Sequence, residues 1–156
     1  MFYCTSGDPL CEDDLESYAP FGRGTRARFV PDGEGALGVP QSVEPLAPHR
    51  IDGWTPADDY PHYEDQEELG VELDDDAFDA VSDAGFPRDG DKWLGWPAWI
   101  QGAELPDCPR CGRQLAFLLQ IDSNAHVDYM FGDCGTGHLS GCPDHPDELS
   151  FHWACS

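Results

Sequence analysis

Two short turns in the second half of the chain carry the residues best suited to chemistry. They are Cys108-Pro109-Arg110-Cys111 and Cys142-Pro143-Asp144-His145, separated by 30 residues. Each turn presents two soft ligands at a two-residue spacing, so a tight turn can direct both at one ion. The combined set is Cys3His, a ligand mix typical of structural zinc. We therefore predict that one zinc ion is held by Cys108, Cys111, Cys142 and His145.

A hydrolytic zinc enzyme of the deaminase type is the alternative interpretation. Such enzymes hold the ion with one His and two Cys, while a Glu activates the bound water. The sequence offers His62, Glu64, Cys108 and Cys111 for these roles. However, His62 lies in a Pro-rich acidic segment where no helix is predicted, and the assignment leaves both ligands of the second turn unused. A site filled by four protein ligands has no position for a catalytic water, so we predict no enzymatic activity.

The remaining cysteines and histidines receive other expected roles. Cys4 and Cys11 are expected to be free thiols, and Cys155 a buried apolar thiol. Cys134 and His138 are placed near the metal as replacement ligands or as groups that contact a ligand. His126 and His152 are expected to be hydrogen-bonded polar residues on strands. A second zinc per chain would implicate one of two further histidines, His49 or His62.

Composition limits the classes of partner. The chain has 156 residues with 31 Asp or Glu, 8 Lys or Arg and a formal net charge of -23. This charge excludes a general nucleic-acid binder, because contacts with phosphates need a basic face. It favours a basic protein client, although the same acidity also suits a protein whose charge serves only solubility or salt adaptation. Oligomeric state is left open.

The cysteine content and the hydropathy pattern bear on compartment. No apolar run approaches the roughly 18 residues of a membrane span, so no membrane association is expected. The N-terminal residues Met1-Phe2-Tyr3-Cys4 have no basic region, long apolar run or cleavage site. We therefore expect a cytoplasmic protein in which the seven cysteines are reduced and metal is preferred over disulfides.

Three segments are distinguished along the chain. Residues 1–53 are interpreted as a partial first repeat, with extended pieces at 1–3 and 26–30, followed by a Pro/Gly-rich connector. Residues 54–91 form an acidic segment in which a short helical turn is expected over 64–69. Asp74 is expected to cap a second helix that Gly85 ends. Residues 92–156 form the zinc-bearing β unit.

The predicted fold class is mainly β, or α+β at most, with antiparallel strands joined by the paired metal turns. Residues 115–122 are a continuous apolar run of strand length, and a turn at 122–124 leads to an expected return strand at 127–131. Further strands are expected at 137–141, which leads to the second metal turn, and at 151–155. The aromatic segment 93–101 is broken by a proline, which suits an edge strand or an extended segment laid across a sheet. About three of the four tryptophans Trp93, Trp96, Trp99 and Trp153 are expected in the core.

The C-terminal half resembles the YwqG-like family of uncharacterised bacterial proteins, which is similar to the eukaryotic programmed cell death protein two family. The segments that carry the resemblance are Gly90-Asp91-Lys92, 94–101, 108–112, 117–123, 130–133, Gly137-His138, 142–146 and 151–155. The resemblance implies a β-rich, often duplicated fold with metal-binding turns and no established activity for the bacterial members.

The eukaryotic relatives are thought to be chaperones of a ribosomal protein, and some bacterial relatives are suspected immunity proteins in toxin systems. Relative to duplicated relatives, this chain opens on what is similar to the tail of a first repeat. Together these observations predict a non-enzymatic, zinc-stabilised protein-interaction module. This module is expected to bind a basic client and to have a chaperone-like or immunity role.

Overall fold

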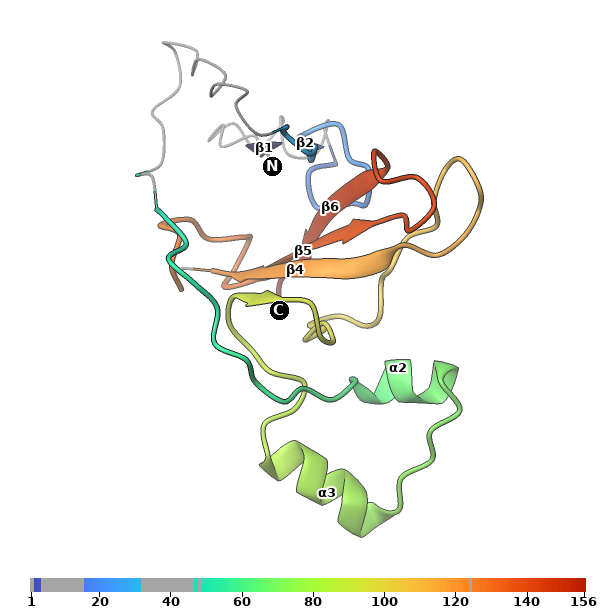
Figure 1. Cartoon of the computed structure of the whole chain (residues 1–156). Coiled ribbons are helices and arrows are strands. Elements are labelled where there is room, and N and C mark those ends of the chain that lie inside the picture. Colours follow the sequence, from blue (N-terminus) through green and yellow to red (C-terminus); the bar gives the residue numbers. More distant parts are fainter. Residues whose placement is uncertain (1, 4–15, 32–46, 48, 124) are drawn as a thin grey trace.

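The structure is a computed structural model that describes residues 2–3, 16–31, 47, 49–123 and 125–156. Its principal element is a four-stranded antiparallel sheet in the order β3-β4-β5-β6 (Figure 1). The strands are β3 (Lys92–Trp93), β4 (Ala116–Asp122), β5 (Thr136–Gly141) and β6 (Leu149–Ala154). Two short helices, α2 (Tyr63–Glu68) and α3 (Asp75–Asp83), lie outside this sheet. The predicted mainly β class is confirmed.

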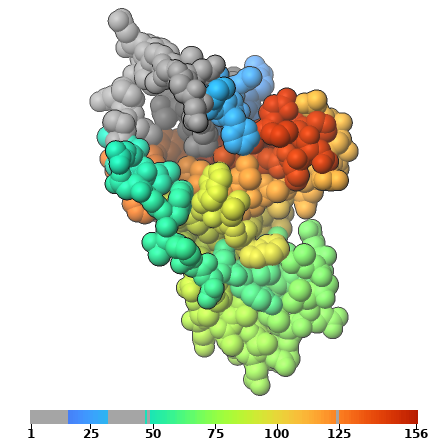
Figure 2. All heavy atoms as spheres, in the orientation of Figure 1, coloured from blue at the N-terminus to red at the C-terminus, as the bar shows by residue number. Residues whose placement is uncertain are grey.

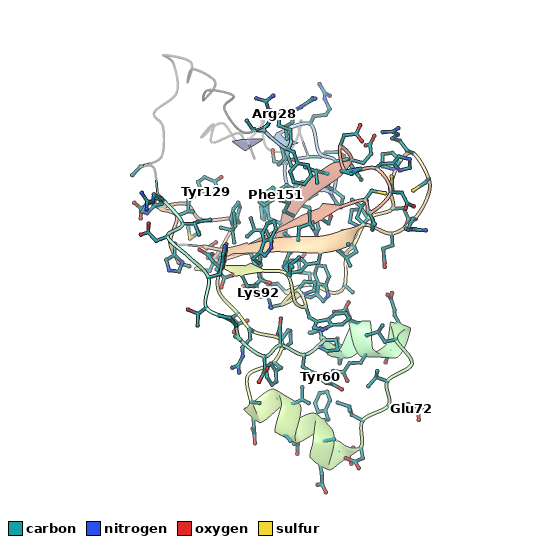
Figure 3. All side chains as sticks on the ribbon, in the orientation of Figure 1. Arg28, Tyr60, Glu72, Lys92, Tyr129 and Phe151 are labelled. Carbon is teal, nitrogen blue, oxygen red and sulfur yellow. The ribbon has the colours of Figure 1, made fainter. Side chains whose placement is uncertain are left out.

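The two faces of the sheet differ in chemistry because side chains alternate along each strand. One face carries the apolar core, in which Phe131, Phe151 and Trp153 are buried. The opposite face carries a cross-strand row of polar residues that includes Gln120, His138 and His152. In Figure 3, Phe151 and Lys92 lie on opposite sides of the sheet. The core therefore occupies one face, and the polar face needs a separate cover.

The N-terminal segment runs beside β6. A two-stranded sheet joins β1 (Phe2–Tyr3) to β2 (Thr25–Arg26). The Trp153 amide donates to the Tyr18 carbonyl at 3.2 Å, and the Thr25 hydroxyl donates to the Phe151 carbonyl at 3.2 Å. These bonds occupy backbone groups that an edge strand would otherwise leave open to another chain. Cys4 and Cys11 lie outside the described residues.

Residues 54–91 form a helical lobe at the β3 side of the sheet (Figure 2). Asp74 caps α3 by accepting a hydrogen bond from the Ala77 amide at 2.8 Å, and Gly85 follows its C-terminus with φ +71°. Both features of the predicted helix are confirmed. The turn expected over 64–69 is also helical, but it begins earlier, because the ring of His62 caps α2.

Several sequence-based expectations for the β unit are wrong. Residues 127–131 form no strand: only Phe131 pairs, in an isolated bridge with Gly135, so β4 is followed along the sheet by β5. Of the four tryptophans expected mainly in the core, Trp153 is buried at 8% exposure, whereas Trp93 is 48% exposed. Trp96 and Trp99 are half-buried. Within the described chain, no helix is both long and apolar enough to cross a bilayer.

Candidate metal centre

The first metal turn is built by backbone hydrogen bonds within residues 106–115. The Cys108 amide donates to the Arg113 carbonyl at 2.8 Å, and the Gly112 amide donates to the Cys108 carbonyl at 2.8 Å. Gly112 has φ +69°, a conformation that suits glycine because it has no Cβ. This reversal folds the chain back immediately after Cys111, so both sulfur atoms face the same side of the turn.

The second metal turn connects β5 to β6. Cys142 directly follows the last residue of β5, and its amide donates to the Glu148 carbonyl at 3.0 Å. The Glu148 amide in turn donates to the His145 carbonyl at 2.9 Å. The strands fix both ends of this loop, so Cys142 and His145 are held opposite the first turn.

The four predicted ligands converge. Cys108 Sγ lies 3.7 Å from His145 Nδ1, Cys142 Sγ lies 3.5 Å from the same nitrogen, and Cys111 Sγ lies 3.7 Å from Cys142 Sγ. All four ligand atoms lie within 4.8 Å of one another. A tetrahedral ion with metal–sulfur bonds of about 2.3 Å and a metal–nitrogen bond of about 2.0 Å requires edges of about 3.8 Å and about 3.5 Å. The cluster therefore fits a four-coordinate metal ion.

Burial and hydrogen bonding favour metal binding at this cluster. Leu115, at 1% exposure, packs with Cys108 and Cys142 and forms an apolar floor. Burial raises the pKa of the Cys108 thiol, but hydrogen bonds from the backbone amides of Arg110 and Cys111 and with the Cys142 and Cys111 thiols outweigh it and lower that pKa to about 7. At Cys111 the backbone hydrogen bond at Arg113 lowers the pKa, but burial and the thiols of Cys108 and Cys142 outweigh it and raise that pKa. A lower pKa favours the thiolate, which is the form that binds metal.

Two exposed ion pairs connect the metal turns. Arg110 Nη1 lies 3.0 Å from Asp147 Oδ2, and Arg113 Nη1 lies 3.0 Å from Asp144 Oδ2. In each pair the arginine belongs to the first turn and the acid to the second. Exposed pairs of this kind contribute only about 0 to 1 kcal/mol, so they add little to the stability of the paired turns.

The residues of the alternative enzyme assignment do not gather at this cluster. His62 Nδ1 accepts from the Glu64 amide as the α2 cap, and Glu64 Oε2 accepts from the Ala103 amide. Among the described residues, the only group of three or more possible metal ligands is the set of Cys108, Cys111, Cys142 and His145. The structure brings neither His62 nor Glu64 into that group.

The other cysteines and histidines also lie outside the ligand set. Cys134 Sγ lies 3.9 Å from Met130 Sδ, in an exposed turn where Cys134 has φ +57°. His126 Nδ1 pairs with Asp91 Oδ2 at 2.8 Å, in a bend and not on a strand. Cys155 is half-buried beside the core, and His49 is exposed. Neither Cys134 nor His138 belongs to the ligand group, so the expectation that one of them supplements it receives no support.

Sequence reasoning missed two features at the polar face of the sheet, namely the contacts of Asp59 and the burial of a histidine pair. Asp59 accepts from the amides of Arg88 and Trp96, each at 2.9 Å, and pairs with Lys92 Nζ at 3.1 Å. His138 and His152 are each 1% exposed, and none of their ring nitrogens has a hydrogen-bond partner. The expectation that His152 is hydrogen-bonded is wrong. Alternating polar residues in 136–140 marked this face, and one of the two alternatives for residues 93–101, an extended segment laid across a sheet, anticipated a cover without saying which face it would lie on.

Comparisons with known proteins found a matching family model but no matching individual protein. No curated protein and no solved structure matches it. A family model described as a domain of unknown function, DUF1963, matches residues 24–146. This range contains all four residues of the candidate metal centre and the whole helical lobe. The chain belongs to the DUF1963 family.

Proposed function

We propose that this protein is a non-enzymatic interaction module in which a structural zinc ion stabilises the sheet and the helical lobe binds a basic protein. Zinc suits the Cys3His donor set and its tetrahedral spacing. Because the protein supplies all four ligands, the ion has no position for a substrate or an activated water. The chaperone-like or immunity role implied by the resemblance to YwqG-like proteins forms the finer part of this proposal.

The observation that carries the binding role is the state of helix α3. Ala77, Phe78 and Val81 form its apolar side, but no residue of α3 is buried and Phe78 is 47% exposed. Neither α2 nor any strand packs closely against this helix. A nine-residue helix is marginal in water unless its apolar side is packed. A partner that covers this side would supply the missing packing.

The charge of the lobe defines the chemistry of that partner. Residues 55–91 contain 14 acidic residues and one basic residue, Arg88. Helix α3 has Asp75, Asp79 and Asp83 at successive four-residue spacings, where like charges repel, and no basic residue in its last turn. Asp83 therefore also opposes the helix dipole. A cationic amphipathic segment would relieve both penalties, whereas a second copy of this acidic chain would increase them.

Eight acidic residues of the helical lobe are candidates for contact with a basic partner, and they divide into two groups. Asp59, Glu64 and Asp74 accept backbone hydrogen bonds and have structural roles. The others are exposed and available to a partner, namely Asp58, Glu67, Glu68, Asp75 and Asp76. In Figure 3, Tyr60 lies between α2 and α3 and Glu72 lies on the loop that joins them. Asp75 and Asp76, at the start of α3, are thus exposed on the same helix as its uncovered apolar side.

A defined peptide probe tests this role. Zinc-loaded protein is titrated by calorimetry with an 18-residue Leu/Lys peptide designed as an amphipathic helix, and with a scrambled peptide of the same composition. We expect binding of the amphipathic peptide alone, weakening steeply with salt because exposed charges are screened. Phe78→Ser should reduce affinity at least tenfold, while Phe29→Ser, at an exposed phenylalanine outside the lobe, should not. Equal affinity for both peptides, or no binding, would contradict the proposal.

A further inference from the structure

The polar face of the main sheet is covered even though its residues are those of a solvent-facing surface. Antiparallel sheets commonly bury an apolar face and leave a polar face in water. Here the polar face is almost inaccessible: Gln120 and Ser140 are 0% exposed, and Ser150, His138 and His152 are each 1% exposed. Phe117, which is paired with Ser140 and lies 6.2 Å from His138 between ring centroids, is a buried apolar residue on the same face. Apart from Phe117, removing the cover would expose groups that water can solvate.

Residues 96–103, which we call the cover segment, lie across this face between the sheet and α2 (Figure 1). The Ala98 amide donates to Gln120 Oε1 at 2.9 Å. The ring of Trp99 lies 4.9 Å from that of His138 and stacks on that of His152 at 6.4 Å. The polar contact of the cover segment with the sheet is thus made to a side-chain acceptor. The strength of such a hydrogen bond depends on nearby charge and on access of solvent.

Helix α2 holds the outer side of the cover segment. Trp99 Nε1 donates to Asp65 Oδ2 at 3.0 Å, and the Ala103 amide donates to Glu64 Oε2. Both acids come from the first turn of α2. The cover segment is thus clamped between two carboxylates on one side and a histidine pair on the other.

The histidine pair is poorly satisfied in this closed arrangement. His138 and His152 are directly opposed on β5 and β6, with ring centroids 5.6 Å apart. All four ring nitrogens and Ser140 Oγ are buried without a hydrogen-bond partner. The Ala98 carbonyl is close enough to raise the pKa of His138, but it does not meet hydrogen-bond geometry. Each buried, unpaired N–H donor costs about 1 to 3 kcal/mol, which opening to water would recover.

We propose that residues 96–103 are a proton-sensitive lid, closed over the polar face while His138 and His152 are neutral and released when both become protonated. Two adjacent imidazolium rings cannot both be accommodated beneath Trp99, because each would be a buried charge without a counter-ion. Opening separates Trp99 from the pair and lets water solvate both rings. The metal turns lie at the far end of β5 and are not required to move.

The surrounding charges support this direction of the pH effect. Burial lowers the pKa of His138 to about 3, with the charges of His152 and Lys92 acting in the same sense, and burial lowers the pKa of His152 to about 4. The closed state is therefore fully favoured above pH 6.5 and loses stability as pH falls toward these values. Burial raises the pKa of Asp65, so this group opposes opening on acidification. Glu64 contacts the segment farther out, at Ala103.

The size of the effect follows from two histidines that titrate normally once open. With an open-state pKa of about 6.5, each histidine multiplies the opening equilibrium about tenfold between pH 7.5 and pH 5.5. The pair therefore gives more than tenfold and up to about a hundredfold, because the two rings stay opposed on β5 and β6 and each charge disfavours the other. A single remaining histidine should give about tenfold, and none should give no change.

Amide hydrogen exchange of the zinc-loaded protein tests the lid. We expect the protection factor of the Ala98 amide, corrected for intrinsic exchange, to fall by more than tenfold and up to about a hundredfold between pH 7.5 and pH 5.5. It should fall about tenfold in His138→Gln or His152→Gln and stay constant in the double variant. His126→Gln, at an exposed histidine, is the matched control and should behave as the unsubstituted protein.

Two further readouts separate lid opening from loss of the fold. The amides of β5 and β6 should keep their protection, and a chromophoric indicator should detect no released zinc. Should the double variant not fold, the imidazole NMR shifts of His138 and His152 in the unsubstituted protein must titrate with the midpoint of the Ala98 change. Constant Ala98 protection, or parallel loss at Ala98 and in β5 and β6, would overturn the proposal.

Discussion

Replacing Asp59 with alanine should destabilise the protein severely, because this carboxylate joins three parts of the chain. It pairs with Lys92 Nζ at 3.1 Å and accepts from the amides of Arg88 and Trp96. The two paired side chains are only 12% and 13% exposed. Removing one partner of a buried ion pair costs about 3 to 5 kcal/mol, because it leaves an uncompensated charge. We expect Asp59→Ala to lower the free energy of unfolding by about 4 kcal/mol.

Urea denaturation at pH 7 with excess zinc measures this loss. The matched control is Asp52→Ala, since the pair of Asp52 with Arg50 is 80% and 88% exposed and should contribute less than about 1 kcal/mol. The double variant Asp59→Ala/Lys92→Met should recover part of the loss, because no charge is left buried. A destabilisation by Asp59→Ala within about 1 kcal/mol of the control would refute the structural role of Asp59.

Three further predictions concern the sheet and the metal turns. The free energy of unfolding, measured in urea, should fall below pH 6.5 by up to about 2.7 kcal/mol per pH unit, since His138 and His152 have lowered pKa values only in the folded state; the His→Gln double variant should lack this slope. Gly137→Ala should lower the melting temperature by several degrees, because a Cβ there would lie 2.5 Å from the Phe151 ring. Arg113→Ala should change zinc affinity less than about fivefold in a competition assay, because its ion pair is exposed.

Local patterns in the sequence predicted the clustering of the four candidate metal ligands and much of the secondary structure. The two-residue ligand spacing specifies its own turn, so Cys108 and Cys111 could be placed with Cys142 and His145 without the fold. The cap Asp74 and the terminating Gly85 likewise fixed α3. An apolar run of strand length identified β4. The strands expected at 137–141 and 151–155 located β5 and β6 to within two residues at each end.

The errors concern contacts between residues distant in sequence. Residues 127–131 alternate as a strand would, but the chain uses them as a connection that delivers Phe131 to the core. Burial of each tryptophan depends on remote partners: Trp99 is held by Asp65, 34 residues earlier. The polar row around His138 was readable as one face of a sheet. An extended segment across a sheet was one alternative for residues 93–101, but the face that this segment covers was not predicted, because it depends on contacts between residues distant in sequence.

The most direct test of the central claim is the metal content and coordination of the purified protein. Elemental analysis should give about one zinc per chain, and X-ray absorption should give three sulfur ligands at about 2.3 Å and one nitrogen at about 2.0 Å. Cys142→Ser should lose most of the zinc, whereas Cys134→Ser, at an exposed cysteine outside the cluster, should keep it. A protein that binds no zinc, or a bound ion with an oxygen ligand from water, would contradict a closed structural site formed by Cys108, Cys111, Cys142 and His145.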